Sequence, residues 1–204
     1  MPLSERRSVE VNISGNVAKE RLRRDLTIPE IRTLEAEKGD VDARQTLGFT
    51  TYEMKSSFSF NLQFFRQNKD SSKGCAWLQN IDASFNVPLV DIFIPSEYPE
   101  GSCEYREIQK HENEHVKILK DTHSEFLGIL KTTLMTKGAL PDASAPQEFE
   151  SYEIKKKEIE DDLKLILDDF MEDFSKTLNK RQRAIDIDEN YAAITSRCEA
   201  WERR

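Results

Sequence analysis

The spacing of apolar residues changes near residue 95, and this change limits the possible folds more than any other feature of the sequence. Before it, apolar and polar residues alternate, which is the period of a half-buried β-strand. The alternating apolar residues are Phe58, Phe60, Leu62 and Phe64 in one run and Ile81, Ala83, Phe85 and Val87 in the next. After residue 103, apolar residues recur every three or four positions, which is the period of an amphipathic helix. Strands followed by helices predict an α+β fold.

The same pattern gives the expected elements. A chain of 204 residues is long enough for one well-packed domain over residues 1–204. Its expected parts are an N-terminal strand and helix within 1–45 (strand 8–14, helix 17–38), a small antiparallel sheet within 46–95 (strands 46–66 and 75–94), a helix over 103–136, a second long helix over 144–183 packed against the first, and a C-terminal segment over 186–204. Pro29 and Pro88 are expected to interrupt the first helix and the second long strand. Ser144 and Gln147 form a capping-box pattern, which predicts the start of the second long helix.

The sequence HENEH places two of the three histidines, His111 and His115, four positions apart in the expected helix 103–136. At about 100° per residue both share a stripe with apolar residues such as Ile108 and Leu119, so both imidazoles are expected to face the core. Residues four apart lie one above the other on a helix, and two imidazoles so placed can bind one metal ion. The alternative is a pair of partly buried histidines that are hydrogen-bonded to backbone or carboxylate groups.

The glutamate beside the first histidine gives the site a chemical role. In the pattern HExxH, this residue acts as the general base on water bound to zinc, so the sequence predicts zinc bound by His111 and His115 with Glu112 as the base. The same five residues also fit the inverted pattern HxxEH, in which Glu114 would be the base. Helical projection places Glu112 nearer the centre of the apolar stripe, which favours Glu112.

A third ligand is expected from a later segment of the chain. His123 lies eight residues beyond His115, about 12 Å along a continuous helix, and is expected at the surface or in the outer shell of the site. The candidates are Glu158, in an ExxxD pattern with Asp162, and the segment from Asp186 to Glu189. The latter pair would also suit the cap of a terminal helix. Tyr191, close by, could donate a hydrogen bond to a developing oxyanion, or could belong to the core.

Charge and hydropathy exclude some partners. The formal net charge is -8 and the sequence pI is near 5.1, whereas nucleic-acid binding needs a concentrated basic surface. The basic clusters ERLRR and KRQR are short and lie among acidic residues. No apolar run approaches the roughly 20 residues that a membrane span requires. We therefore expect neither nucleic acid as a partner nor a membrane-spanning segment.

The cysteines and the N-terminus give opposite indications about location. Cys75, Cys103 and Cys198 all flank the ends of expected elements, where a disulfide could join segments. One disulfide and one odd thiol would fit an oxidising compartment, whereas three thiols would fit the cytoplasm. Spacing does not determine which cysteines pair. The first residues, MPLSERRSVEV, lack the apolar region of a secretory signal, as expected of a cytoplasmic protein or of a chain from which a signal was removed.

Three stretches resemble a known group of proteins. VEVNISGN near the start, GSCEYREIQKHENEHV in the middle and AIDIDENYAAITSRCEAW at the end are similar to uncharacterised bacterial families described as secreted zinc-dependent proteases. A sheet, an apolar strand and an HExxH helix, in that order, resemble the zincin metallopeptidases. The resemblance implies a periplasmic or secreted zinc peptidase, acting on a peptide or protein, in which the strand before the helix, residues 89–94, would pair with the substrate.

Two other functions fit the sequence. The protein could bind zinc without catalysis, using a closed shell of four ligands to join the helix to the C-terminal segment. It could also be an interaction protein without metal, because the apolar spacing between residues 149 and 180 suits packing against another helix. Packing of this helix on the HENEH helix of the same chain would account for that spacing equally well.

Overall fold

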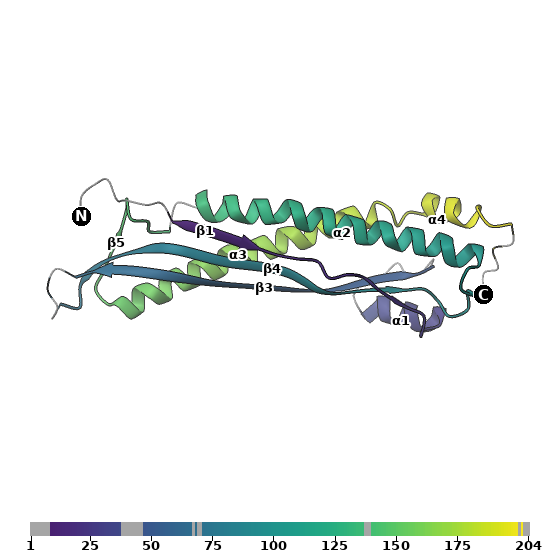
Figure 1. Cartoon of the computed structure of the whole chain (residues 1–204), viewed down its shortest axis with the longest axis horizontal. Coiled ribbons are helices and arrows are strands. Elements are labelled where there is room, and N and C mark those ends of the chain that lie inside the picture. Colours follow the sequence, from purple (N-terminus) through teal and green to yellow (C-terminus); the bar gives the residue numbers. More distant parts are fainter. Residues whose placement is uncertain are drawn as a thin grey trace. The chain divides into compact units, whose positions relative to one another are not determined.

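The computed structural model of the protein describes residues 9–37, 47–66, 68, 71–136, 140–199 and 201. The elements are β1 (Glu10–Ser14), β2 (Arg21–Arg23), α1 (Ile28–Glu37), β3 (Phe49–Phe65), β4 (Gly74–Phe93), α2 (Cys103–Thr136), β5 (Gln147–Phe149), α3 (Tyr152–Arg183) and α4 (Asp188–Thr195) (Figure 1). The described chain therefore combines a sheet with long helices, as an α+β fold requires. It divides into two compact units, formed by the described parts of 1–16, 55–86 and 124–174 and of 17–54, 87–123 and 175–204.

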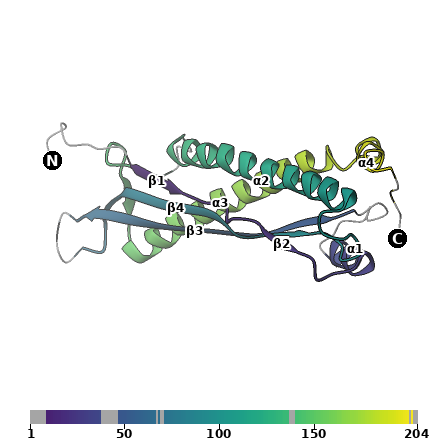
Figure 2. The same ribbon diagram turned by 45° about the vertical axis from the view of Figure 1, so that its right-hand side comes forward.

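Strand β4 is the centre of a five-stranded sheet, because each of the other four strands pairs with it. Strands β3 and β4 run side by side in both views of the chain (Figure 2). Residues 10–14 of β1 pair with 80–84 of β4 in parallel, and residues 21–23 of β2 pair with 91–93 in parallel. The short β5 pairs with β4 in the antiparallel direction, through residues 74–76 and 147–149.

The predicted small antiparallel sheet is therefore wrong, since β1 and β2 both run parallel to β4. Alternation of apolar residues shows which face of a sheet a side chain occupies, but it carries no information about the direction or partner of the strand. Residues 91–93, within the stretch 89–94 predicted to pair with a substrate, already pair with β2, so that edge of β4 is not open to a peptide there.

In the first unit, apolar side chains of β4 pack against aromatic side chains of the two long helices. The ring of Phe85 lies edge-on to Phe170 and Phe174 of α3, with ring centroids 5.4 and 4.7 Å apart. Phe126 of α2 contacts Phe174 at 5.3 Å. Such aromatic pairs contribute more to the stability of a core than the burial of their surface area alone would give. The predicted packing of the second long helix against the first is thus observed within this unit.

In the second unit, the end of β4 is buried from Val90 to Ile94. Asp91 is buried there because Arg21 of β2 binds it with two hydrogen bonds, Nε to Oδ1 at 2.7 Å and Nη2 to Oδ2 at 2.8 Å. A buried carboxylate requires such a partner. The basic cluster ERLRR therefore neutralises an acid of the same sheet.

The predicted helix over 17–38 is wrong in its first half, where β2 forms instead. Helix α1 begins only at Ile28. Its start is a capping box, in which the backbone N–H and the hydroxyl of Thr27 both donate to Glu30 at 2.7 Å. Pro29 lies in the first turn, where its missing N–H has no helical partner to lose. It therefore belongs to the start of the helix and does not interrupt it.

Two further boundaries differ from the sequence prediction. Strand β4 continues through Pro88, so the predicted interruption of this strand is wrong. Helix α3 begins at Tyr152 and not at residue 144. The backbone N–H groups of Ser144 and Ala145 donate to Asp142 at 2.7 and 2.8 Å, and this turn replaces the predicted helix start. The helix predicted over 103–136 matches α2.

Candidate metal centre

Helix α2 brings His111 and His115 together on its buried face. The two side chains are one turn apart, their residues are 5% and 9% exposed, and their ring centroids lie 4.7 Å apart. The two Nε2 atoms are 3.2 Å apart. The predicted burial of both histidines is confirmed, and the convergence of their Nε2 atoms is what two ligands of one ion require.

Asp186 is the third group that reaches these nitrogens. Its Oδ1 lies 3.0 Å from His111 Nε2 and 2.9 Å from His115 Nε2. It lies in the turn between α3 and α4, and the backbone N–H of Ile185 donates to Gln182 in that turn at 3.0 Å. Asp186 does not cap α4, whose N-cap is Ile187 without a side-chain bond. The other candidate, Glu158, is exposed in the first unit and pairs with Lys155.

The distances among the three groups suit a small divalent cation. Their donor atoms form a triangle with sides of 3.2, 3.0 and 2.9 Å. Ligand atoms about 2.0–2.1 Å from a tetrahedral ion lie roughly 3.3–3.4 Å apart, so little movement would admit an ion. Two imidazole nitrogens and one carboxylate oxygen are donors that suit zinc and also iron(II). Three protein ligands would leave one position of a tetrahedral site for another group.

Gln182 of α3 holds the His115 imidazole in one orientation. Its Oε1 accepts a hydrogen bond from His115 Nδ1, and its Nε2 donates to the backbone oxygen of His115 at 3.2 Å. Because the amide oxygen can only accept, Nδ1 carries the hydrogen, and Nε2 is left to face Asp186 and His111. An outer hydrogen bond of this kind fixes the tautomer of a histidine ligand.

Tyr191 of α4 completes the shell around Asp186. Its hydroxyl donates to Asp186 Oδ1 at 3.1 Å, and its ring lies 5.5 Å from that of His111. Burial, followed by the negative charges of Asp186 and Glu112, raises the pKa of the Tyr191 hydroxyl. The hydroxyl therefore stays protonated and orients the carboxylate. Its partner in this structure is Asp186, whereas the sequence left open a role toward an oxyanion and a place in the core.

Glu112 is buried beside the histidines, and its residue is 2% exposed. Ligand atoms of His111, Glu112 and His115 all lie within 4.8 Å of one another. Thr50 at the start of β3 donates its hydroxyl to Glu112 Oε2 at 2.8 Å. Burial raises the pKa of Glu112, although the neighbouring histidines act in the opposite direction. Glu114 is exposed, so Glu112 is the glutamate that the site can use, as the helical projection predicts.

Gly48 allows the chain to pass directly over Glu112. A Cβ atom at this position would lie 2.7 Å from Ile108 Cγ2 and 2.8 Å from Glu112 Oε1. Any larger residue must therefore displace the carboxylate or the neighbouring isoleucine. A glycine at the start of an expected strand is a known sign of a close approach, so the sequence contained this signal.

The substitution Gly48→Ala tests that contact. We expect it to lower the free energy of unfolding by about 1–3 kcal/mol, the usual cost of overpacking, and to reduce any activity that depends on Glu112. The matched control is Gly128→Ala in α2, where an added Cβ meets no atom within 4 Å. Denaturant unfolding of both variants provides the measurement. Equal stability of the two variants would show that the close approach does not hold.

Hydrogen bonding also sets the protonation of the histidine pair. Burial by itself would lower the pKa of His115, but its hydrogen bond to Asp186 and the charge of Glu112 outweigh burial and raise the pKa to about 9. Burial would raise the pKa of Asp186, yet the hydrogen bonds with His111 and His115 hold it well below its usual range. Without an ion, protonated His115 thus holds the carboxylate of Asp186 against the two histidines.

Metal binding should therefore depend on pH. A metal ligand must be deprotonated, and the pKa of His115 is about 9, so an ion has to displace this proton at neutral pH. We expect zinc affinity to rise about tenfold per pH unit as the pH increases from about 6.5 to 8.5, one proton being released per ion. Competition with a chelator of known affinity at several pH values measures this slope. A constant affinity over this range would contradict the assignment of His115 as a ligand.

The identity of the third ligand gives a separate prediction. Asp186→Ala should weaken zinc binding at least about a hundredfold, since removing even an outer-shell partner typically costs 10–100-fold. Glu158→Ala is the matched control, because this exposed carboxylate pairs only with residues of its own helix among the described contacts. The same chelator competition measures both variants. Equal affinities would exclude Asp186 as a ligand.

Sequence reasoning did not find several residues around the centre. Gln182 and Thr50 hold His115 and Glu112, but neither residue type is distinctive at its position. Glu35 of α1 is buried, and after burial and other charges it contributes to the raised pKa of Tyr191. His123 is 4% exposed, so a surface position for it is wrong.

Known proteins do not identify the chain. Comparison with protein-family models, curated proteins and solved structures finds no match. None of the helices in the described ranges combines the length and apolar composition needed to cross a bilayer. A function must therefore be argued from the geometry of the centre.

Proposed function

We propose that this protein is a zinc-dependent hydrolase that cleaves peptide bonds. One observation supports the proposal most: His111, His115 and Asp186, from segments about 70 residues apart, direct three donor atoms to one point beside the buried carboxylate of Glu112. Two histidines, one carboxylate ligand and a separate carboxylate base make up the donor set of a hydrolytic zinc site. It is also the arrangement that a zincin-type metallopeptidase would need.

The residues of the chain then have distinct roles. His111, His115 and Asp186 would hold the ion, which when bound would polarise a carbonyl group and make a water molecule more acidic. Glu112 would take a proton from the attacking water and return it to the leaving amine. Burial raises the pKa of its carboxyl, which is the direction that favours proton exchange by a general base. Thr50 would orient this carboxylate, and Gln182 and Tyr191 would orient the ligands.

Strand β3 is the best position for an extended peptide. Among the described strands β3 pairs with β4 alone, so its other edge carries backbone groups that a peptide could bind by β-augmentation. Thr50, near its start, donates a hydrogen bond to Glu112, and a Cβ added at Gly48, the residue before the strand, would lie 2.8 Å from the same carboxylate. The start of β3, and not residues 89–94, would therefore bring a substrate backbone to the carboxylate.

A zinc site without catalysis is the second candidate, and burial favours it. His111, Glu112 and His115 are each at most 9% exposed, and a structural ion is normally closed off from solvent. The two candidates differ in the use of Glu112, which a structural site does not need. The disulfide between Cys103 and Cys198 supports a periplasmic or secreted location for either.

Elemental analysis and a cleavage assay test the proposal together. The protein is purified without a histidine tag, offered zinc, freed of excess and analysed for metal, and then incubated with a peptide mixture that is read by mass spectrometry. Near-stoichiometric zinc with cleavage that a chelator abolishes is the expected result. Stoichiometric zinc without cleavage would favour the structural site, and absence of bound metal would overturn both.

A further inference from the structure

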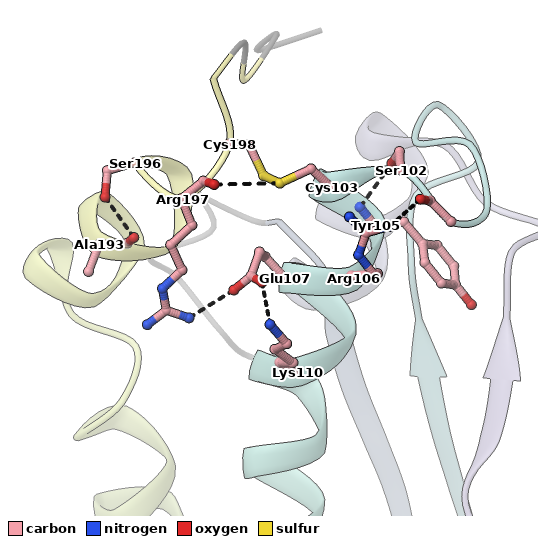
Figure 3. Close-up of a disulfide and its surroundings, with 11 residues drawn as sticks. Ser102, Cys103, Tyr105, Arg106, Glu107, Lys110, Ala193, Ser196, Arg197 and Cys198 are labelled. Carbon is pink, nitrogen blue, oxygen red and sulfur yellow. Dashed lines mark hydrogen bonds and ion pairs between the residues drawn. A yellow bond between two sulfur atoms is a disulfide. The ribbon is translucent and has the colours of Figure 1, made fainter.

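The segment that carries Asp186 and Tyr191 is joined covalently to the helix that carries the histidines. A disulfide links Cys103, the first residue of α2, to Cys198, three residues after α4. Figure 3 shows Cys198 meeting Cys103 at the start of α2, with Arg197 reaching Glu107 on the next turn. The residues from 184 to 198 are thus fixed at one end by α3 and at the other by this bridge.

Apart from the contacts of Asp186 and Tyr191 with the two histidines, the other described links of this segment to α2 are weaker than a covalent bond. Helix α4 has only eight residues and no side-chain cap at Ile187, and a helix this short is not stable by itself. Ile194 is its one buried residue. Arg197 Nη1 donates to Glu107 Oε2 at 2.8 Å, and the arginine side chain is 55% exposed and the glutamate side chain 10% exposed, so solvent screens this ion pair from the arginine side. The disulfide is therefore the strongest link between this segment and α2.

The disulfide is attached to α2, the helix that carries the proposed ligands His111 and His115. Cys103 precedes His111 by eight residues, which is about 12 Å along α2. It therefore fixes the segment close to the place where Asp186 Oδ1 meets the two Nε2 atoms, and it limits how far Asp186 and Tyr191 can move from α2. Without it, those two residues would be retained by α3, by the weak links and by their own contacts with His111 and His115.

We propose that the Cys103–Cys198 disulfide is a redox latch for the metal centre, so that the oxidised chain binds the ion more tightly than the reduced chain. This inference rests on the proposed metal binding. Reduction by a dithiol would transfer two electrons and two protons to the bridge, giving two cysteine thiols and a disulfide of the reductant. The ligand Asp186 would then be held less often against the histidines. A protein carrying this latch would hold its metal less tightly in a reducing compartment.

Zinc affinity of the two redox forms tests the latch. Wild type is measured oxidised and after reduction with a phosphine, which becomes a phosphine oxide with oxygen from water and does not compete for zinc as a dithiol does. The double variant Cys103→Ser/Cys198→Ser is measured beside Cys75→Ser, which alters the free thiol and leaves the bridge. We expect zinc binding at least about tenfold weaker in the reduced chain and in the double variant, within the usual range of coupling between sites, and unchanged binding in Cys75→Ser.

A second measurement uses the wild-type chain alone, so its result does not depend on whether a variant folds. Coupling between two equilibria is equal in both directions, so zinc should stabilise the wild-type disulfide against a glutathione redox buffer by the same factor. Zinc binding that is equal in the two redox forms, with no effect of zinc on the disulfide, would overturn the proposed latch. It would not contradict the proposed zinc site. Oxidised wild type that binds no zinc would overturn both proposals.

Discussion

Alanine in place of His115 should abolish stoichiometric zinc binding and lower the stability of the zinc-loaded protein by about 3 kcal/mol. A ligand that binds only the folded state stabilises it by roughly 2.7 kcal/mol when its free concentration is a hundred times its dissociation constant. The variant loses this term, and it also removes the hydrogen bonds of the His115 ring with Gln182 and Asp186. Elemental analysis, together with thermal unfolding in zinc and in chelator, measures both effects.

His123→Ala is the matched control for this experiment. His123 lies on the same helix eight residues further on and is also buried, at 4% exposed. Its replacement should lower stability equally in zinc and in chelator, because it is not a ligand in the proposed site. Loss of zinc from both variants would point to a general effect on α2, and retention of zinc by His115→Ala would remove His115 from the ligand set.

The helices and strand faces could be predicted from local patterns, whereas their pairing could not. The period of three and four gave α2 over its full length, and the period of two gave the buried positions of β4. Strand direction depends on which distant segment supplies the partner. The local sequence of β4 does not indicate that β1 and β2 are its partners. Local hydrogen bonds account for another difference between prediction and structure. A turn at Asp142 forms where a helix start was predicted.

The candidate site divides in the same way. His111, Glu112 and His115 share one helix, so periodicity alone predicted their common buried face. Asp186 could be proposed but not chosen over Glu158, because the choice depends on where α3 ends and how the chain turns back toward α2. The disulfide belongs to this second class too, since three cysteines allow more than one pairing and only the fold brings Cys198 to Cys103.

Glutamine in place of Glu112 should preserve zinc binding and reduce hydrolysis by about two to four orders of magnitude, the usual contribution of a general base. The amide has nearly the shape of the carboxylate, and its oxygen can still accept the hydrogen bond of Thr50, so the buried position is maintained. It cannot take a proton from water. Comparing metal content and cleavage rate in the same preparation separates the loss of the base from the loss of the ion.

Glu114→Gln is the control that distinguishes the two readings of HENEH. Glu114 is exposed, whereas Glu112 is 2% exposed and bonded to Thr50, so the control should keep the wild-type rate. A fully active Glu112→Gln beside an inactive Glu114→Gln would assign the base to the inverted pattern. Full activity in both variants would show that neither glutamate is the base, and would direct attention to Asp186 and Tyr191, which are hydrogen-bonded to each other beside the histidines.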